Sequence, residues 1–366
     1  MITYGLFLYI ALTAVVVFLA FGISSSGEGS MQAPNPYMSR VVARNRILVL
    51  AIYILLSAVS ALRIAVGNDY WVYRDNFNLI AQDRHVSYEI GFRYVVKFLQ
   101  WFLDYDNYLP IFAFFSLVTV FLMIKAVYDQ SEWFVFSLFI FMTAGYYFGS
   151  LNNVRYYLAL SAAMYSIKYV LKKDYIRFFA IIAAAALFHK SVLIVIPLYL
   201  LATVNWNAIG HFIISAFCAT LLFMPGLYRR IIFIFYPFYE GSMFDTGQTS
   251  LTNIAKAAAV FIFALIYREK VKEDPKLKFG FYCNLWALLL YVLCSFMPEI
   301  SRIGFYLNIT NIFFIPALIR RIENKKIRTV WTVLICAAFI AFFALFLKSA
   351  YNTDVRILPY YNWIFQ

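Results

Sequence analysis

Two neighbouring residues, His189 and Lys190, place an imidazole that can accept a proton beside an ammonium cation. They interrupt the apolar run Phe178–Val204. A single straight helix over that run would be about 40 Å long, against a hydrocarbon core of about 30 Å, and would hold the pair near the bilayer centre. A charge there costs roughly 3 kcal/mol. We therefore predict a broken helix, a hairpin whose turn holds the pair at the outer end of a water-filled cavity as a candidate functional site.

Further cations, carboxylates, amides and tyrosines are predicted to lie at the same outer level of the membrane. They stand at the ends of separate apolar runs or in the segment between two of them, and they are Arg63, Asp69, Tyr70, Tyr73, Glu89, Asn152, Asn153, Arg155, Glu299 and Arg302. Runs far apart in the sequence thus bring both charge signs to one plane, which a purely structural protein has little use for. Their common side is the main argument for a site.

Most of these residues also have a structural explanation, and for His189 and Lys190 it is an ordinary exposed loop. Arg63 stands where an arginine snorkels to the interface. The segment Asn152–Arg155 fits a helix N-cap followed by an interfacial anchor. Glu299 and Arg302 have the spacing of an i, i+3 ion pair, and Tyr70–Tyr73 has the composition of an interfacial aromatic belt.

The composition identifies the elements that must position these residues. Of the 366 residues, 64% are hydrophobic, 20% aromatic and 13% charged, and the mean hydropathy is +0.75. These values exclude a soluble domain and indicate a polytopic membrane protein. We predict an all-α transmembrane bundle of about twelve spanning or near-spanning helices, in a single integral membrane domain over residues 1–366.

Charge and cysteine usage exclude several classes of partner. The net charge is +13, but most lysines and arginines fall in short loops between apolar runs, so they indicate membrane orientation rather than nucleic-acid binding. The four cysteines lie within apolar runs without CxxC spacing, and they are Cys218, Cys283, Cys294 and Cys336. We expect no disulfide, no metal site and no cofactor.

Twelve apolar runs define the predicted topology. They cover residues 3–22, 47–66, 108–127, 133–149, 154–171, 177–188, 191–204, 208–226, 252–267, 279–297, 303–319 and 329–347. The loops after the odd-numbered runs are short and basic, which makes them cytoplasmic and places both termini outside. If residues 178–204 crossed the membrane once, every later loop would change sides. The basic loops near 268–278 and 320–328 are therefore cytoplasmic only if the helix is broken. Outside, residues 67–107 include an amphipathic stretch, 87–102, predicted to lie along the interface.

Five motifs occur in the order known from one protein family. They read RIAVGNDYWVY (63–73), YEIGFRYV (88–95), YFGSLNNVRYYLALSAAMYSIKYVL (147–171), FHKSVLIVIPLYLL (188–201) and ISRIGFYL (300–307). Over roughly Arg46–Arg320 the chain resembles the EpsG family, the Wzy-type polymerases of bacterial exopolysaccharide, capsule and O-antigen. The family commonly reads N-x-x-R-Q and R-x-G-T-D-Y, where this chain has Tyr156 for the glutamine and Asn68 for the threonine.

The resemblance implies a glycosyltransferase that transfers a growing glycan from undecaprenyl diphosphate onto the terminal sugar of a lipid-linked repeat unit. It implies the bacterial cytoplasmic (inner) membrane, with the active site facing outside, and leaves open a chain-length regulator as a further partner. The candidates for holding the diphosphate are Arg63, Arg155, Lys190 and Arg302. The candidates for the base are His189, Asp69 and Glu299, with Glu89 fourth. Sugar and substrate contacts fall to Tyr70, Tyr73, Glu89 and Asn152. We expect cationic side chains to do the work of a divalent ion.

Three other functions remain open at this point. An O-antigen ligase-like transferase would pass the glycan to another acceptor, and usually has one very large outer loop. A transporter or flippase for lipid-linked sugars would favour inverted repeats and polar residues in both membrane halves. A membrane acyltransferase would pair a histidine with a carboxylate or asparagine, and here His85 and His211 look peripheral.

Overall fold

The computed structural model describes residues 2–23, 36–103, 108–235, 237–242, 245, 247, 250–297, 299–352 and 356–364. The chain divides into two compact units. Unit 1 comprises residues 1–166, 179–192 and 319–366, and unit 2 comprises residues 167–178 and 193–318. Because four elements cross these boundaries, each element is given below with the unit in which it begins.

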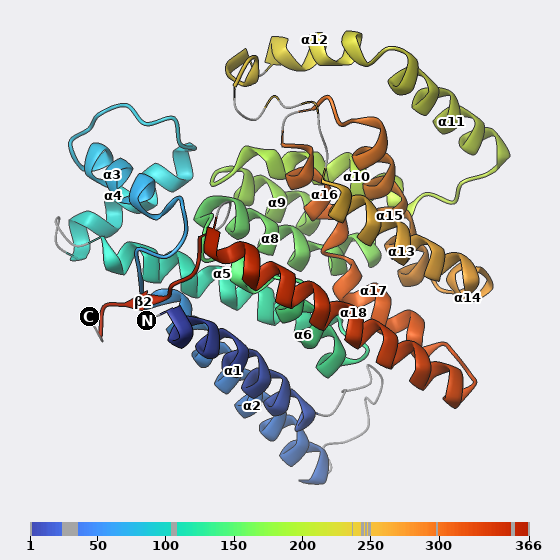
Figure 1. Ribbon diagram of the computed structural model, residues 1–366, viewed down its shortest axis with the longest axis horizontal. Coiled ribbons are helices and arrows are strands. Elements are labelled where there is room, and N and C mark those ends of the chain that lie inside the picture. Colours follow the sequence, from blue (N-terminus) through green and yellow to red (C-terminus); the bar gives the residue numbers. More distant parts are fainter. Residues whose placement is uncertain are drawn as a thin grey trace. The chain divides into compact units, whose positions relative to one another are not determined.

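Unit 1 begins with two long helices and contains the N-terminal half of the chain. Its elements are α1 (Ile2–Phe21), α2 (Pro36–Ala61), β1 (Arg63–Ile64), α3 (Tyr70–Ala81), α4 (Ile90–Leu103), α5 (Leu109–Gln130), α6 (Phe134–Thr143), α7 (Tyr146–Gly149), α8 (Val154–Leu171), η1 (Lys190–Ile194), α18 (Lys325–Asn352) and β2 (Tyr361–Asn362). Helix α9 (Tyr175–Ala186) begins in unit 2 and continues into unit 1. Figure 1 shows α1 and α2 side by side and the N-terminal end of α1 near β2.

Unit 2 is a smaller helical unit. Its elements are α10 (Val195–Thr203), α11 (Ala208–Phe223), α12 (Pro225–Phe235), η2 (Pro237–Tyr239), α13 (Leu251–Ile266), α14 (Arg268–Glu273), α15 (Pro275–Leu293), α16 (Ile300–Asn308) and α17 (Asn311–Arg320). Side chains start several of these helices. Asn207 accepts the N–H of Gly210 at 2.8 Å and begins α11, and Asp274 accepts the N–H of Lys276 at 2.8 Å and begins α15.

The all-α polytopic prediction is confirmed. In the described part of the chain, six helices are long and apolar enough to cross a membrane, or seven if the α11–α12 pair, bent by 86°, is one span. Four shorter apolar helices accompany them. All twelve predicted runs overlap helices, but four of them are divided between two helical elements. The run 133–149 is divided into α6 and α7, where Gly145 adopts a left-handed conformation (φ +82°). The run 191–204 covers η1 and α10, 208–226 covers α11 and the start of α12, and 303–319 covers α16 and α17.

The predicted amphipathic helix is present as α4, and a further helix, α3, precedes it. The buried residues of α3 include Tyr70, Tyr73, Phe77 and Ile80, a helical spacing that the sequence analysis did not use. An aromatic cluster joins both helices to α5: Tyr70 stacks on Phe112 with ring centres 4.4 Å apart. Phe92 and Phe115 stack in the same way, at 4.7 Å. The outer helices are therefore held against the bundle, which fixes the position of the residues between them.

Candidate functional site

The carboxylate of Glu89 joins three of the predicted site residues. Its Oε2 accepts a hydrogen bond from Nη1 of Arg155, and its Oε1 accepts the backbone N–H of Lys190 at 3.1 Å and lies 3.4 Å from Nδ1 of His189. The side chains of Glu89, Arg155 and His189 are 14%, 18% and 16% exposed. We call these four residues the Glu89 cluster. Glu89 is 66 residues from Arg155 and 101 from Lys190.

The cluster forms where the predicted helix break meets the start of α4. Helix α9 ends at Ala186, and a 3₁₀ helix, η1, begins at Lys190. A break of this kind leaves backbone groups without helical partners. The carbonyl of Leu187 accepts the N–H of Phe92 from α4 at 3.2 Å, and the N–H of Lys190 is satisfied by Glu89. The break is thus confirmed and has a physical reason, while the reversal of direction in a hairpin stays a prediction.

Gly91 allows this close approach. A Cβ atom at Gly91 would lie 2.7 Å from Cβ of Leu187 and 2.8 Å from its carbonyl oxygen. No larger residue could stand there without moving α4 or the end of α9. The glycine was not among the predicted site residues, although the motif YEIGFRYV contains it.

Arg155 is positioned by the start of α8 and by two tyrosines. The Oδ1 atom of Asn153 accepts the N–H of Tyr156 at 3.2 Å, so the N-cap expected from the sequence is present. It also accepts the hydroxyl of Tyr73 at 3.1 Å, and that hydroxyl in turn accepts the N–H of Arg155 at 3.3 Å. The guanidinium lies 3.7 Å from the ring centre of Tyr88, a cation–π contact. Tyr73 therefore supports the site, and Tyr88 is a site residue that sequence reasoning missed.

Asn152 and Asp69 extend this arrangement. The backbone N–H of Asp69 donates to Oδ1 of Asn152 at 3.2 Å. Gly67, with φ +97°, lies so close to Asn152 that a Cβ atom would be 2.7 Å from its Cα. Burial raises the pKa of Tyr73, and the charge of Asp69 adds to that shift. Asp69, a predicted base, is therefore close enough to Tyr73 to affect its pKa. The side chain of Asn152 fixes the backbone of Asp69 through the hydrogen bond to its N–H.

The charge on Glu89 is fixed by its surroundings. Burial by itself raises the pKa of this carboxyl, but His189, the charge of Arg155 and the N–H of Lys190 outweigh it and lower the pKa to about 2. A carboxylate with so low a pKa is a weak base near neutral pH and a strong partner for cations. The Oε1 atom of Glu89 lies 3.4 Å from Nδ1 of His189, which is buried without a hydrogen-bond partner in the described structure, and Tyr156 packs edge-on against the imidazole ring with ring centres 5.7 Å apart. The arrangement can thus orient an imidazole for proton transfer.

Arg155 keeps donors for a further ligand. A guanidinium has five N–H donors. Nη1 contacts Glu89, and Nε is buried without a hydrogen-bond partner in the described structure. Lys190 is exposed and directly follows His189. Two cationic side chains therefore stand beside an oriented imidazole.

The structure places Arg63 elsewhere in unit 1. Its side chain is 1% exposed, and Nη1 donates to Oγ of Ser116 at 2.7 Å and to the carbonyl of Ser60. The strand β1 that contains it pairs with the C-terminal strand β2, with Arg63 opposite Asn362. Its hydrogen bonds in the described structure go to α2 and α5, which does not favour the predicted diphosphate contact. Tyr70 is also buried, stacked in the aromatic cluster.

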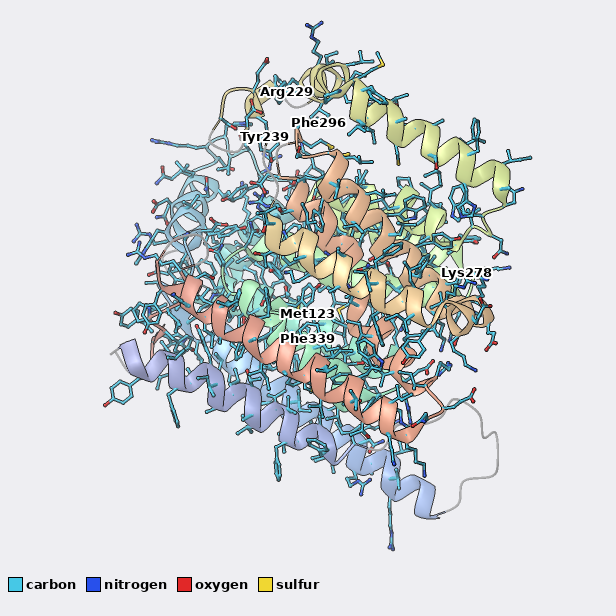
Figure 2. The ribbon with its side chains drawn as sticks, turned by 45° about the vertical axis from the view of Figure 1, so that its right-hand side comes forward. Met123, Arg229, Tyr239, Lys278, Phe296 and Phe339 are labelled. Carbon is cyan, nitrogen blue, oxygen red and sulfur yellow. The ribbon has the colours of Figure 1, made fainter. Side chains whose placement is uncertain are left out.

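Glu299 and Arg302 lie in unit 2, whereas the Glu89 cluster belongs to unit 1. Nε of Arg302 lies 2.7 Å from Oε2 of Glu299, so the i, i+3 ion pair expected from their spacing is present. Two further arginines follow the bend between α11 and α12, and one of them, Arg229, binds Oδ2 of Asp245 at 2.6 Å. Figure 2 shows Arg229 and Tyr239 close together, which agrees with the packing of α12 against η2.

A search for groups of three or more histidine, cysteine or acidic side chains that could hold a metal ion finds none among the described residues. The cysteines are unpaired there as well.

Comparison with known proteins extends the resemblance. The model of the EpsG family matches residues 46–362, which includes every residue of the Glu89 cluster and reaches past Arg320 to β2. No curated protein and no solved structure matches the chain.

Proposed function

The chain belongs to the EpsG family, a family of the polysaccharide polymerase type, and from that premise we propose that it joins lipid-linked oligosaccharide repeat units at the outer side of the bacterial cytoplasmic membrane. The donor is a glycan on undecaprenyl diphosphate, and the acceptor is a hydroxyl of the terminal sugar on a second lipid-linked unit. The product belongs to an exopolysaccharide, a capsule or an O-antigen.

The observation that carries the proposal is the Glu89 carboxylate held between His189, Arg155 and the N–H of Lys190. Transfer of a sugar from a lipid diphosphate needs two things from a protein: a proton acceptor for the attacking hydroxyl, and cations for the departing diphosphate. In the Glu89 cluster, His189 is the candidate proton acceptor, and Arg155 and Lys190 are the candidate cations.

In the proposed reaction, Nε2 of His189 accepts the proton of the acceptor hydroxyl while its oxygen forms a bond to the anomeric carbon. The bond from that carbon to the diphosphate oxygen breaks, and the electron pair leaves with the diphosphate. Glu89 does not take the proton itself, because its pKa is about 2. Instead its contact with Nδ1 orients the ring and stabilises the imidazolium, a role that carboxylates have beside catalytic histidines in other folds.

Arg155 and Lys190 bind the negative charge that develops on the diphosphate. A guanidinium can bind two phosphate oxygens at once, whereas an ammonium acts as a point charge. We propose that these side chains take the place of a divalent cation. Direct displacement at the donor would invert the anomeric centre.

An in vitro polymerisation assay tests this function. Purified full-length protein in nanodiscs is incubated with its lipid-diphosphate repeat unit in the presence of EDTA, and the products are separated as a ladder. We expect a ladder from the wild type, and losses of about 100-fold or more in initial rate for His189→Ala and Arg155→Ala.

The chain offers matched controls for both variants. Arg74, like Arg155, pairs with a carboxylate and lies over an aromatic ring, 4.5 Å from the centre of Trp71, but its side chain is 36% exposed and its partner Asp75 is 62% exposed. His85 is an exposed histidine. Arg74→Ala and His85→Ala are expected to keep the wild-type rate. No ladder from the wild type with authentic substrate would reject the polymerase, and transfer of a single glycan to another acceptor would instead indicate a ligase-like transferase.

A further inference from the structure

Helix α13 of unit 2 contains one charged side chain, Lys256, in an otherwise apolar sequence. An ionisable group in such a helix is costly and marks a functional-site hypothesis. Lys256 is partly buried, and its Nζ lies 5.9 Å from the ring centre of Phe305 on α16. The ammonium therefore lies on the side of α13 that faces α16.

The facing sides of α13 and α16 are polar along two turns. One turn before Lys256, Nδ2 of Asn253 donates to Oγ of Ser301 at 3.4 Å. Ser301, Phe305 and Asn308 share one face of α16, since they are spaced i, i+4, i+7. Oδ1 of Asn308 is buried without a hydrogen-bond partner in the described structure. This side of α16 therefore combines polar groups with a cation from the neighbouring helix.

Arg302 adds a second cation at the start of α16. It directly follows Ser301, its side chain is 37% exposed, and its Nε pairs with Glu299 at 2.7 Å. Together Lys256 and Arg302 bring two positive charges against the single carboxylate of Glu299. The guanidinium of Arg302 is suited to a phosphate, which arginine can bind in a bidentate manner.

This group lies at the end of unit 2 where a lipid-linked substrate is expected. Figure 2 labels Lys278, which lies in the first turn of α15, and Phe296, which lies just past the other end of this helix. Lys278 belongs to a basic loop predicted to be cytoplasmic, whereas Phe296 leads to Glu299 and the start of α16. The predicted topology thus places Lys256 and Arg302 towards the outer side.

We propose that Lys256 and Arg302 bind the diphosphate of the second lipid-linked substrate. The inference rests on the proposed function, because an enzyme that joins two lipid-linked glycans binds two diphosphates, and the Glu89 cluster holds cations for one. The ammonium of Lys256 supplies a point charge between α13 and α16. The planar guanidinium of Arg302, which is more exposed, supplies two parallel N–H donors for the phosphate oxygens. Glu299 keeps Arg302 in place when no substrate is bound.

An anionic phospholipid shares the phosphate chemistry of this ligand, so the test separates the two sources. Native mass spectrometry of the detergent-purified full-length protein counts bound undecaprenyl diphosphate, the probe used. We expect two equivalents on the wild type, one on Lys256→Met and one on Arg155→Met, with none on the double variant. Excess phosphatidylglycerol is expected to displace neither.

Two further variants make the measurement specific. Lys256→Arg keeps the charge and is expected to keep two equivalents, and Lys348→Met removes an exposed lysine of α18 and is expected to do the same. In the ladder assay, Lys256→Met should raise KM for the repeat unit about tenfold or more, because a charge-assisted hydrogen bond to phosphate is lost. Thermal unfolding of each variant in detergent shows whether it is folded.

The outcomes distinguish the inference from the function on which it rests. Two equivalents on folded Lys256→Met, or displacement of the second equivalent by phosphatidylglycerol, would overturn the second diphosphate site and leave the polymerase intact. One equivalent on the wild type, lost in Arg155→Met, would have the same meaning. No binding to the wild type would overturn both.

Discussion

Replacement of Glu89 by glutamine tests the central feature of unit 1. Glutamine has nearly the same shape and keeps an oxygen that can accept the N–H of Lys190. It removes the negative charge that faces Arg155 and His189. We expect Glu89→Gln to lose both stability and activity.

The size of the stability change follows from the pKa of Glu89. The pKa falls from an ordinary 4.5 to about 2 in the folded protein, and each unit corresponds to about 1.4 kcal/mol, so the carboxylate contributes about 3 kcal/mol. Glutamine keeps one of the hydrogen bonds, so we expect a loss of about 2–3 kcal/mol in the free energy of unfolding. Because the folded-state pKa is the lower one, this contribution is fully present above pH 4.5 and is lost as the pH falls through about 2.

Two assays check the prediction. Unfolding in detergent, followed at pH 7 and at decreasing pH, should show the wild type more stable than Glu89→Gln at pH 7 and the difference shrinking below pH 4.5. In the ladder assay, the rate should fall about 100-fold, the size of contribution made by a well-oriented general base.

A surface carboxylate provides the control. Asp75 pairs with Arg74 at 2.8 Å, but its side chain is 62% exposed. Asp75→Asn should therefore change the free energy of unfolding by less than about 1 kcal/mol. If Glu89→Gln had the wild-type rate and stability, or if its stability difference were the same at pH 7 and pH 3, the carboxylate would not organise the site.

Three further variants test how the cluster is built. Arg155→Lys should lower kcat/KM in the ladder assay by about tenfold or more, because lysine lacks the planar fork that contacts both Glu89 and the Tyr88 ring. Gly91→Ala should destabilise the protein by about 1–3 kcal/mol in detergent unfolding, since its Cβ would lie 2.7 Å from a side-chain atom of the neighbouring segment. Asn153→Ala removes the cap of α8, so it should cost about 1–2 kcal/mol in the same measurement.

Each of these variants has an outcome that contradicts its prediction. A wild-type kcat/KM for Arg155→Lys would mean that charge alone matters at this position. Unchanged unfolding of Gly91→Ala would show that α4 and the end of α9 are not in close contact. For Asn153, the serine variant is the matched control, since serine can also cap a helix, and equal stability of the alanine and serine variants would exclude the cap.

Local rules predicted much of the fold and part of the site. The cost of a cation in an apolar run located the helix break at His189, and the spacing of Glu299 and Arg302 predicted their ion pair. The amphipathic stretch before the third apolar run was recognised from its period. These features depend on residues near one another in the sequence, where periodicity and spacing carry the information.

The partners of Glu89 could not be predicted in this way. Sequence reasoning ranked Glu89 last among the bases, whereas the structure places it between His189 and Arg155. That position depends on α4 packing against α5 and on the satisfaction of backbone groups at a helix break, neither of which has a local signal. Arg63 was predicted to be a diphosphate ligand because it stands at a helix end. In the structure, Arg63 is buried, and its strand β1 pairs with the C-terminal strand β2, which no local pattern predicts.

The low pKa of Glu89 also restricts the path of the proton in the proposed reaction. A carboxylate with a pKa of about 2 is a weak base for the proton of the acceptor hydroxyl at neutral pH. His189 therefore receives it and becomes an imidazolium that Glu89 stabilises. The diphosphate leaves with two or more negative charges, and its oxygens compete with Glu89 for the guanidinium of Arg155.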